Sequence, residues 1–255
     1  MEFDLAKEFI LSKLDGLSNR LSYHKKQHTL DVLHAVEQIA ESEGVNEEGK
    51  HLLRIAALMH DTGFLEKYQG HEEKGCEYAQ EWLPQFDYSS GQIQRVVGMI
   101  MATKIPHTPK NKEEQIICDA DLDYLGTDLY DEISESLFKE WKFYGFVNSS
   151  KEWLEKQIGF LKLHKYFSEF STRERVSKKK KTLRLSSEYL TTASKFIKGL
   201  KSYQKYYGKK DPLIVTPWMR LGNNKDVQIH LSFGATEAKP PEDVDAIMDV
   251  TETGT

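Results

Sequence analysis

The sequence predicts an all-α protein, on three observations. Apolar residues recur at helical spacing through residues 1–170, helix-capping residues, Gly and Pro separate these runs, and strand-like composition is sparse before residues 213–215. The 255 residues suffice for one sizeable core. We therefore expect a helical domain over residues 1–206, with its functional motifs between residues 20 and 170.

The first three helices have recognisable signals along the chain. Apolar residues at helical spacing mark the first helix: Phe3, Phe9, Ile10 and Leu14. The second helix is expected over residues 26–43, because Gly44 would end it. Asn46 is placed to cap the third helix, which runs to the pair His60-Asp61.

The later helices follow the same rules. Residues 76–83 have helical spacing, and Ser89 or Ser90 is placed to cap the helix that comes next. Residues 131–169 again read as helical and are rich in the aromatic side chains that suit a core or a partner surface. Residues 183–206 are compatible with one more helix.

The C-terminal stretch differs in composition. From Gly208 the chain becomes mixed in character, and residues 240–255 are acidic and contain no aromatic residue. We expect residues 207–255 to form an irregular extension, partly disordered from about residue 236. No function follows from its composition.

Composition and charge exclude several classes of protein. The formal net charge of -5 does not favour nucleic acid as a partner. Two cysteines, Cys76 and Cys118, are too few for a disulfide framework or a thiolate zinc site. The N-terminus lacks the pattern of a signal peptide, and no apolar stretch approaches the roughly 20 residues of a membrane span. We expect a cytoplasmic protein that does not bind a membrane.

The dipeptide His60-Asp61 is the strongest functional signal. It closes the apolar run of residues 52–59, where an ionised carboxylate needs a partner, and a metal ion satisfies imidazole and carboxylate together. A histidine, His28, lies on the helix before it, and an aspartate pair follows in residues 119–121. These long gaps predict ligands that converge from separate helices, rather than the short ligand loops of zinc fingers.

Four local patterns then follow one another: Tyr23-His24, His28-Thr29 with Val32, the apolar helix ending in His60-Asp61, and Asp119-Ala120-Asp121-Leu122. In this order they resemble the HD-domain superfamily of metal-dependent phosphohydrolases, over residues 20–170. The resemblance implies an HD-domain helical bundle with a divalent-metal site in its interior.

On this resemblance, four residues would bind the metal: His28, His60, Asp61 and Asp121. Asp121 matches the family's final aspartate best, because an Ala-Asp-Leu run occupies that place in relatives, and Asp119 is the alternative. His71 resembles a position that supplies a ligand to a second metal, and His107 lies where binuclear members often place another. The site would hold one or two ions of Mn, Co, Fe, Mg or Zn.

Three residues are expected to take part in catalysis: His24, Asp61 and Lys104. In phosphodiesterase relatives, the histidine at the place of His24 donates a proton to the leaving oxygen. Lys25 departs from the asparagine common in those relatives, so monoesterase and diesterase both stay open. Lys104 is placed to hold a substrate phosphate, with Arg20 as a second candidate, although a lone cation is more often a surface charge.

The resemblance implies a metal-dependent phosphohydrolase that cleaves a phosphomonoester or phosphodiester, above all of a nucleotide, with metal-activated water. The expected partner is therefore a small phosphorylated substrate. Two alternatives stay open: a di-iron oxygenase on the same fold, which would need both His71 and His107, and a non-catalytic regulatory HD domain. The sequence does not set the oligomeric state.

Overall fold

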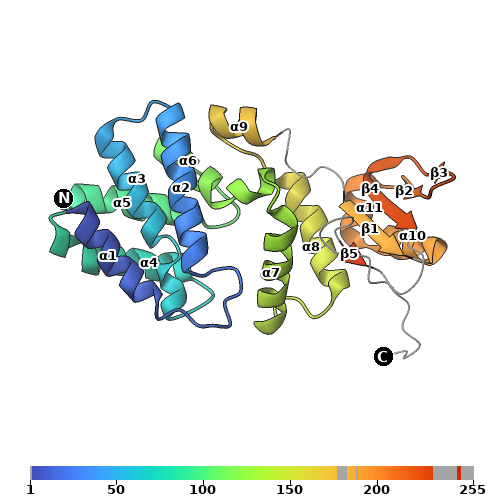
Figure 1. The fold of residues 1–255 in the computed structure, drawn as a ribbon, viewed down its shortest axis with the longest axis horizontal. Coiled ribbons are helices and arrows are strands. Elements are labelled where there is room, and N and C mark those ends of the chain that lie inside the picture. The colour runs from blue at the N-terminus through green and yellow to red at the C-terminus, as the bar shows by residue number, and fades with distance from the viewer. Residues whose placement is uncertain (1, 177–182, 188, 232–245, 248–255) are drawn as a thin grey trace. The chain divides into compact units, whose positions relative to one another are not determined.

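The computed structural model describes residues 2–176, 183–187, 189–231 and 246–247 (Figure 1). The chain forms two compact units, each made of two stretches. Unit 1 comprises Met1–Thr127 and Tyr166–Lys179, and unit 2 comprises Asp128–Lys165 and Lys180–Thr255.

Every regular element in the described residues of unit 1 is a helix. Its elements in chain order are α1 (Phe3–Leu14), α2 (Lys26–Ser42), α3 (Glu47–Met59), the 3₁₀ helix η1 (Thr62–Leu65), α4 (His71–Trp82), η2 (Leu83–Phe86), α5 (Ser90–Ala102), α6 (Lys112–Asp121), η3 (Asp123–Gly126) and α9 (Glu169–Arg175). The prediction of a helical domain around the motifs is confirmed.

The helix starts use the capping residues that the sequence indicated. The Asn46 side chain accepts a hydrogen bond from the backbone N–H of Gly49 at 2.8 Å, which fixes the start of α3. Ser89 and Gln92 form a reciprocal capping box at the start of α5. Gly44 follows α2 with a φ of 65°, a left-handed conformation that glycine adopts without strain.

The core of unit 1 is centred on α3. Every residue from Ile55 to Met59 is fully buried, so the helix is apolar around its whole circumference at its C-terminal end. Helices α1, α2, α5 and α6 pack against it. His60 and Asp61 therefore follow directly after the most buried helix of the unit.

Unit 2 combines helices with a sheet. Its elements are α7 (Tyr130–Phe143), α8 (Ser150–Leu163), β1 (Leu183–Ser187), α10 (Leu190–Gly199), α11 (Lys201–Tyr207), β2 (Pro212–Val215), β3 (Arg220–Leu221), β4 (Asn224–Leu231) and β5 (Ala246–Ile247). The strand order is β3-β2-β4-β1-β5, with β2 and β3 antiparallel and the other neighbours parallel. Apolar residues of α8, α10, α11, β1 and β4 form one core.

The sheet was not anticipated. Residues 183–187 form the strand β1, whereas the sequence was compatible with a helix there. The strand left no clear sequence signal because it is short and its partners, β4 and β5, lie tens of residues later. The units also do not follow the expected boundary at residue 206, since α7, α8, α10 and α11 pack within unit 2. The disorder expected from about residue 236 concerns residues that, apart from Ala246–Ile247, lie outside the described part of the chain.

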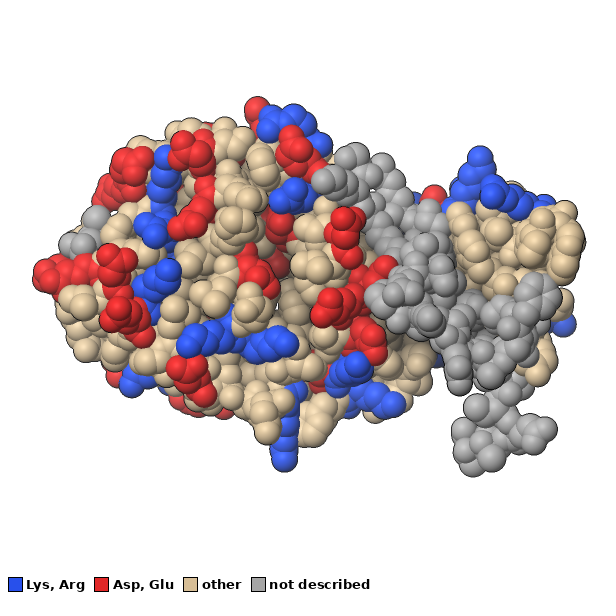
Figure 2. All heavy atoms as spheres, in the orientation of Figure 1, with Lys and Arg blue, Asp and Glu red and all other residues tan. Residues whose placement is uncertain are grey.

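Charged side chains of both signs are interspersed over the face drawn in Figure 2. Several form exposed ion pairs, such as Lys26 with Asp15 at 2.7 Å, and such pairs typically contribute at most about 1 kcal/mol to stability. Among the helices of the described residues, none is both long and apolar enough to cross a membrane.

Candidate metal centre

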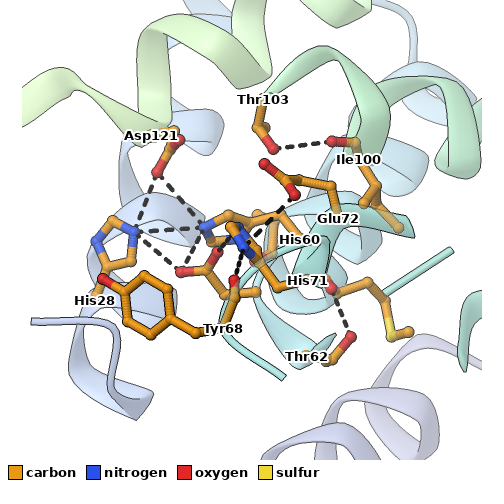
Figure 3. Close-up of polar contacts among 12 residues, drawn as sticks. His28, His60, Thr62, Tyr68, His71, Glu72, Ile100, Thr103 and Asp121 are labelled. Carbon is orange, nitrogen blue, oxygen red and sulfur yellow. Dashed lines mark hydrogen bonds and ion pairs between the residues drawn. The ribbon is translucent and has the colours of Figure 1, made fainter. Parts of the chain in front are cut away.

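Three elements of unit 1 bring the predicted ligands together (Figure 3). His28 lies in the first turn of α2, His60 follows the last residue of α3, and Asp121 is the last residue of α6. One ligand atom from each of these three side chains can be chosen so that all lie within 4.8 Å of one another. Asp61 completes the cluster.

The four side chains converge on one small volume. The Nε2 atom of His28 lies 3.1 Å from Asp121 Oδ1 and 3.4 Å from the Nε2 atom of His60. Asp61 Oδ2 lies 3.2 Å from His60 Nε2 and 3.4 Å from His28 Nε2. The sequence predicted these four ligands from segments far apart in the chain, and the fold places them side by side.

Backbone carbonyls fix the imidazole rings. His60 donates from Nδ1 to the carbonyl oxygen of Ala57 at 2.8 Å, and His71 donates from Nδ1 to that of Tyr68 at 2.9 Å. In a neutral ring this leaves Nε2 with its lone pair, and in both residues Nε2 faces Asp61. Metal-binding histidines are commonly held in this way.

The cluster fits a divalent cation. Asp61 Oδ2 is buried and accepts no hydrogen bond from the described residues, so its charge is balanced only by the facing imidazoles. Two imidazole nitrogens and two carboxylates that share a buried space repel one another unless a positive charge lies among them. Nitrogen and oxygen donors of this kind suit Mn, Fe, Co or Zn.

The electrostatics show how strongly the cluster attracts positive charge. Burial alone would lower the pKa of His60, but Asp61 and Asp121 raise it well above the usual value. Burial would raise the pKa of Asp61, but His60 holds it well below its usual range. The same holds for Asp121, whose pKa is lowered by His28 and His60 against the effect of burial. A proton on His60 and a metal ion therefore compete for one place.

His71 lies on the other side of the Asp61 carboxylate. Its Nε2 atom is 3.7 Å from Asp61 Oδ1, the oxygen that does not face His28 and His60. Gly63 permits this approach, because a Cβ atom there would lie 1.9 Å from the carbonyl oxygen of His71. Glu72, also buried, has Oε2 3.5 Å from His71 Nδ1. Asp61 thus lies between the imidazoles of His28 and His60 on one side and that of His71 on the other.

Residues 26–123 match the family model described as HD domain. This part of the chain is an HD domain. The chain is also similar to the crystal structure of a predicted HD superfamily hydrolase from an uncultured Thermotogales bacterium, with 24% identity over 59% of this chain and 90% of that chain and a TM-score of 0.43. No curated protein matches the chain.

His24 lies just outside the matched residues but beside the cluster. Helix α2 begins at Lys26, so His24 sits in the bend before it and not one helical turn before His28. Its ring stacks on Phe64 with centroids 4.4 Å apart and lies 5.9 Å from the ring of His28. Phe64 also stacks on His71 at 3.9 Å. One buried phenyl ring therefore contacts both histidines.

Lys104 and His107 are bound to groups outside the four-residue cluster. The Lys104 ammonium group ion-pairs with Glu73 on α4 and is about half exposed, so a substrate phosphate would compete with Glu73 for it. His107 donates from Nε2 to the backbone carbonyl of Thr103 at 3.0 Å. Arg20, the second candidate for a phosphate contact, is exposed.

Asp119 and Asp121 occupy different environments. The Asp119 carboxylate accepts hydrogen bonds from the backbone N–H groups of Phe167 and Ser168 and from the Ser168 hydroxyl. Burial raises its pKa above the usual value, although these hydrogen bonds act in the opposite direction. Of the two aspartates, only Asp121 contributes an oxygen to the cluster of the HD domain.

Two neighbours of the cluster received no role from the sequence. Neither Phe64 nor Glu72 belongs to a motif that the sequence singled out, yet Phe64 stacks on His24 and His71 and Glu72 lies 3.5 Å from His71. A weak signal was available, because both lie within a short segment that begins at Asp61 and includes His71. Only the fold shows that this segment closes on itself, with η1 packed against α4.

Proposed function

We propose that the HD domain of this protein is a metal-dependent hydrolase that cleaves a phosphomonoester or phosphodiester of a nucleotide. One observation carries the proposal. Two imidazole nitrogens and two carboxylates face one another in a buried space, and Asp61 Oδ2 there accepts no hydrogen bond from the described residues. A buried anionic site of this composition is suited to a divalent cation, and such cations serve phosphoryl transfer.

Four residues would hold the cation: His28, His60, Asp61 and Asp121. When bound, a Mn, Co, Fe, Mg or Zn ion supplies Lewis acidity that activates water and takes up negative charge on phosphoryl oxygens. The Ala57 carbonyl keeps the Nε2 lone pair of His60 directed at that place. Surrounding apolar residues of α3 exclude water, which strengthens each of these electrostatic contacts.

His24 would transfer a proton to the leaving oxygen. Histidine is the side chain whose ordinary titration lies nearest neutral pH, and this one lies beside the cluster without belonging to the four ligands. Contact with Phe64 restricts the orientation of its ring. Its ring is therefore held next to the place where a substrate would bind at the metal.

Aromatic rings next to the cluster support a nucleotide as substrate. Tyr23 contacts the rings of His24 and His28, with centroids 4.7 and 4.5 Å apart, and Tyr124 lies 5.7 Å from Tyr23. Tyr68 lies 6.0 Å from His24. Tyr23 is itself buried, so the partly exposed rings of Tyr68 and Tyr124 are those on which a base would stack, an interaction worth roughly 1–3 kcal/mol in single-stranded nucleic-acid sites.

The di-iron oxygenase alternative is less well supported. It needs His71 and His107 as ligands of a second metal. His71 does face Asp61, but the Nε2 atom of His107 is hydrogen-bonded to Thr103. We therefore keep hydrolysis as the proposed reaction and His71 as the candidate ligand of a second ion.

Metal analysis of the purified protein and a phosphate-release screen test the proposal together. The screen uses nucleoside mono-, di- and triphosphates, cyclic nucleotides and aryl phosphates with added Mn, Co or Mg. We expect metal-dependent release that Asp61→Ala abolishes and Asp31→Ala retains, since Asp31 is exposed on α2. Bound metal without release from any ester would refute the hydrolase, and two bound irons without release would favour the oxygenase.

A further inference from the structure

The buried carboxylate of Asp119 joins two distant parts of unit 1. It is fully buried on α6 and accepts four hydrogen bonds from residues that follow it by almost fifty positions. The backbone N–H of Phe167 lies 2.9 and 3.2 Å from its two oxygens, and the N–H and hydroxyl of Ser168 lie 2.8 and 2.6 Å from Oδ2. Asp121 follows two residues later.

The return segment, defined as residues 166–175, contacts the chain on both sides of Asp121. The Tyr166 hydroxyl donates to the carbonyl oxygen of Leu122 at 3.2 Å. Arg175 donates from Nε to Asp123 Oδ1 at 2.7 Å, and both side chains are mostly buried. Partly buried, charge-assisted contacts of this kind are stronger than exposed ones.

The return segment is also packed closely against the chain after Asp121. A Cβ atom at Gly126 would lie 2.6 Å from Cβ and 2.9 Å from Cα of Arg175, so only glycine permits this approach. Ser168 accepts a hydrogen bond from the N–H of Ser171 at 3.1 Å and so caps α9. The segment is therefore ordered by its own cap as well as by α6.

Asp121 depends on this support because α6 ends at it. The next residue, Leu122, has left the α-helical conformation with φ −107° and ψ 19°, so α6 does not continue past Asp121 and only the short 3₁₀ helix η3 follows. We propose that Asp119 is a positioning residue of the metal centre, which fixes Asp121 by anchoring the return segment on α6. This inference rests on the proposed metal site, and it extends the functional unit beyond residue 123, where the family match ends.

Metal affinity of the full-length chain tests the inference. Asp119→Asn keeps the shape of the side chain but replaces an accepting oxygen by an amide that faces N–H donors. We expect the dissociation constant for Co or Mn, measured by isothermal titration, to rise about tenfold, as for other residues that support metal ligands. Ser168→Ala removes the hydroxyl that donates to Asp119 and should weaken metal binding less than Asp119→Asn does. If Asp119→Asn does not fold, Ser168→Ala still tests the inference.

Glu114→Gln is the matched control for general loss of stability. Glu114 is another buried carboxylate on α6, which accepts hydrogen bonds from Lys110 and Asn111 at the end of the helix far from Asp121. We expect it to lower the thermal stability but not the metal affinity. The inference is overturned if Asp119→Asn binds metal as the wild type does, or if Glu114→Gln weakens binding equally. Absence of binding by the wild type would overturn the metal site itself, and this inference with it.

Discussion

Replacement of Asp61 by Asn gives the sharpest test of the metal centre. The substitution keeps the volume of the side chain but removes one of two carboxylates from a site whose other donors are His28, His60 and Asp121. Asp61 Oδ2 is buried and lies within 3.4 Å of both imidazole nitrogens. A neutral amide there cannot offset the charge of a divalent ion, so we expect metal binding to be largely lost.

The size of the effect follows from the role of Asp61. Substitutions of groups that only support a metal ligand cost about 10–100-fold in affinity, so loss of a ligand should cost at least about 100-fold. At a metal concentration of 100 times the wild-type dissociation constant, binding stabilises the wild type by about 2.7 kcal/mol, and a variant with 100-fold weaker binding by only about 0.4 kcal/mol. The unfolding midpoint should then rise by roughly 5–10 °C in the wild type and about 1–2 °C in the variant.

Thermal unfolding followed by circular dichroism, with and without Mn or Co, measures this difference. Each protein is compared with its own metal-free form, so any effect of the substitution on the metal-free fold cancels. Asp31→Asn provides the control, because it makes the same chemical change on the exposed face of α2. A full metal-induced shift in Asp61→Asn would refute the assignment of Asp61 as a ligand.

Three further predictions follow from the structure. Metal affinity should increase from pH 6 to pH 8, by up to about tenfold per pH unit. The carboxylates of Asp61 and Asp121 raise the pKa of His60, so metal must displace a proton that stabilises the metal-free protein at low pH. Titration calorimetry that showed the same affinity across this range would contradict the displacement of a proton from His60. Gly63→Ala should lower the free energy of unfolding, measured with urea, by at least about 3 kcal/mol, because the Cβ of the new alanine would clash with the backbone of His71. A near-neutral result would contradict this close approach of the two backbones. Cys76 and Cys118 should react with a thiol reagent only after denaturation, because both side chains are buried and burial raises the pKa of Cys76 to about 12. Rapid labelling of the native protein would contradict the burial of these two thiols.

The helices of unit 1 were predictable because their signals are local. Asn46 and Ser89 cap the helices that the sequence indicated, and the apolar run before His60 is the most buried helix. The sheet of unit 2 was not predictable in the same way. Its strands are short, and β1 pairs in parallel with β4 and β5, which lie tens of residues later, so the pairing of β1 leaves no periodic signal in its own segment.

The candidate site was predictable in part. The positions of His28, His60, Asp61 and Asp121 follow from their order along the chain and from a family resemblance. The sequence could not separate Asp119 from Asp121, because the difference depends on hydrogen bonds to residues 167–168.

The division of unit 1 into two stretches has a consequence for how the protein matures during translation. Synthesis proceeds from the N-terminus at about 5–20 residues per second, so α6 is synthesised a few seconds before residues 166–175. Throughout that interval the Asp119 carboxylate has none of its three hydrogen-bond donors, the N–H groups of Phe167 and Ser168 and the Ser168 hydroxyl. At this stage the elements that carry His28, His60 and Asp61 have been synthesised, whereas the return segment that supports Asp121 has not.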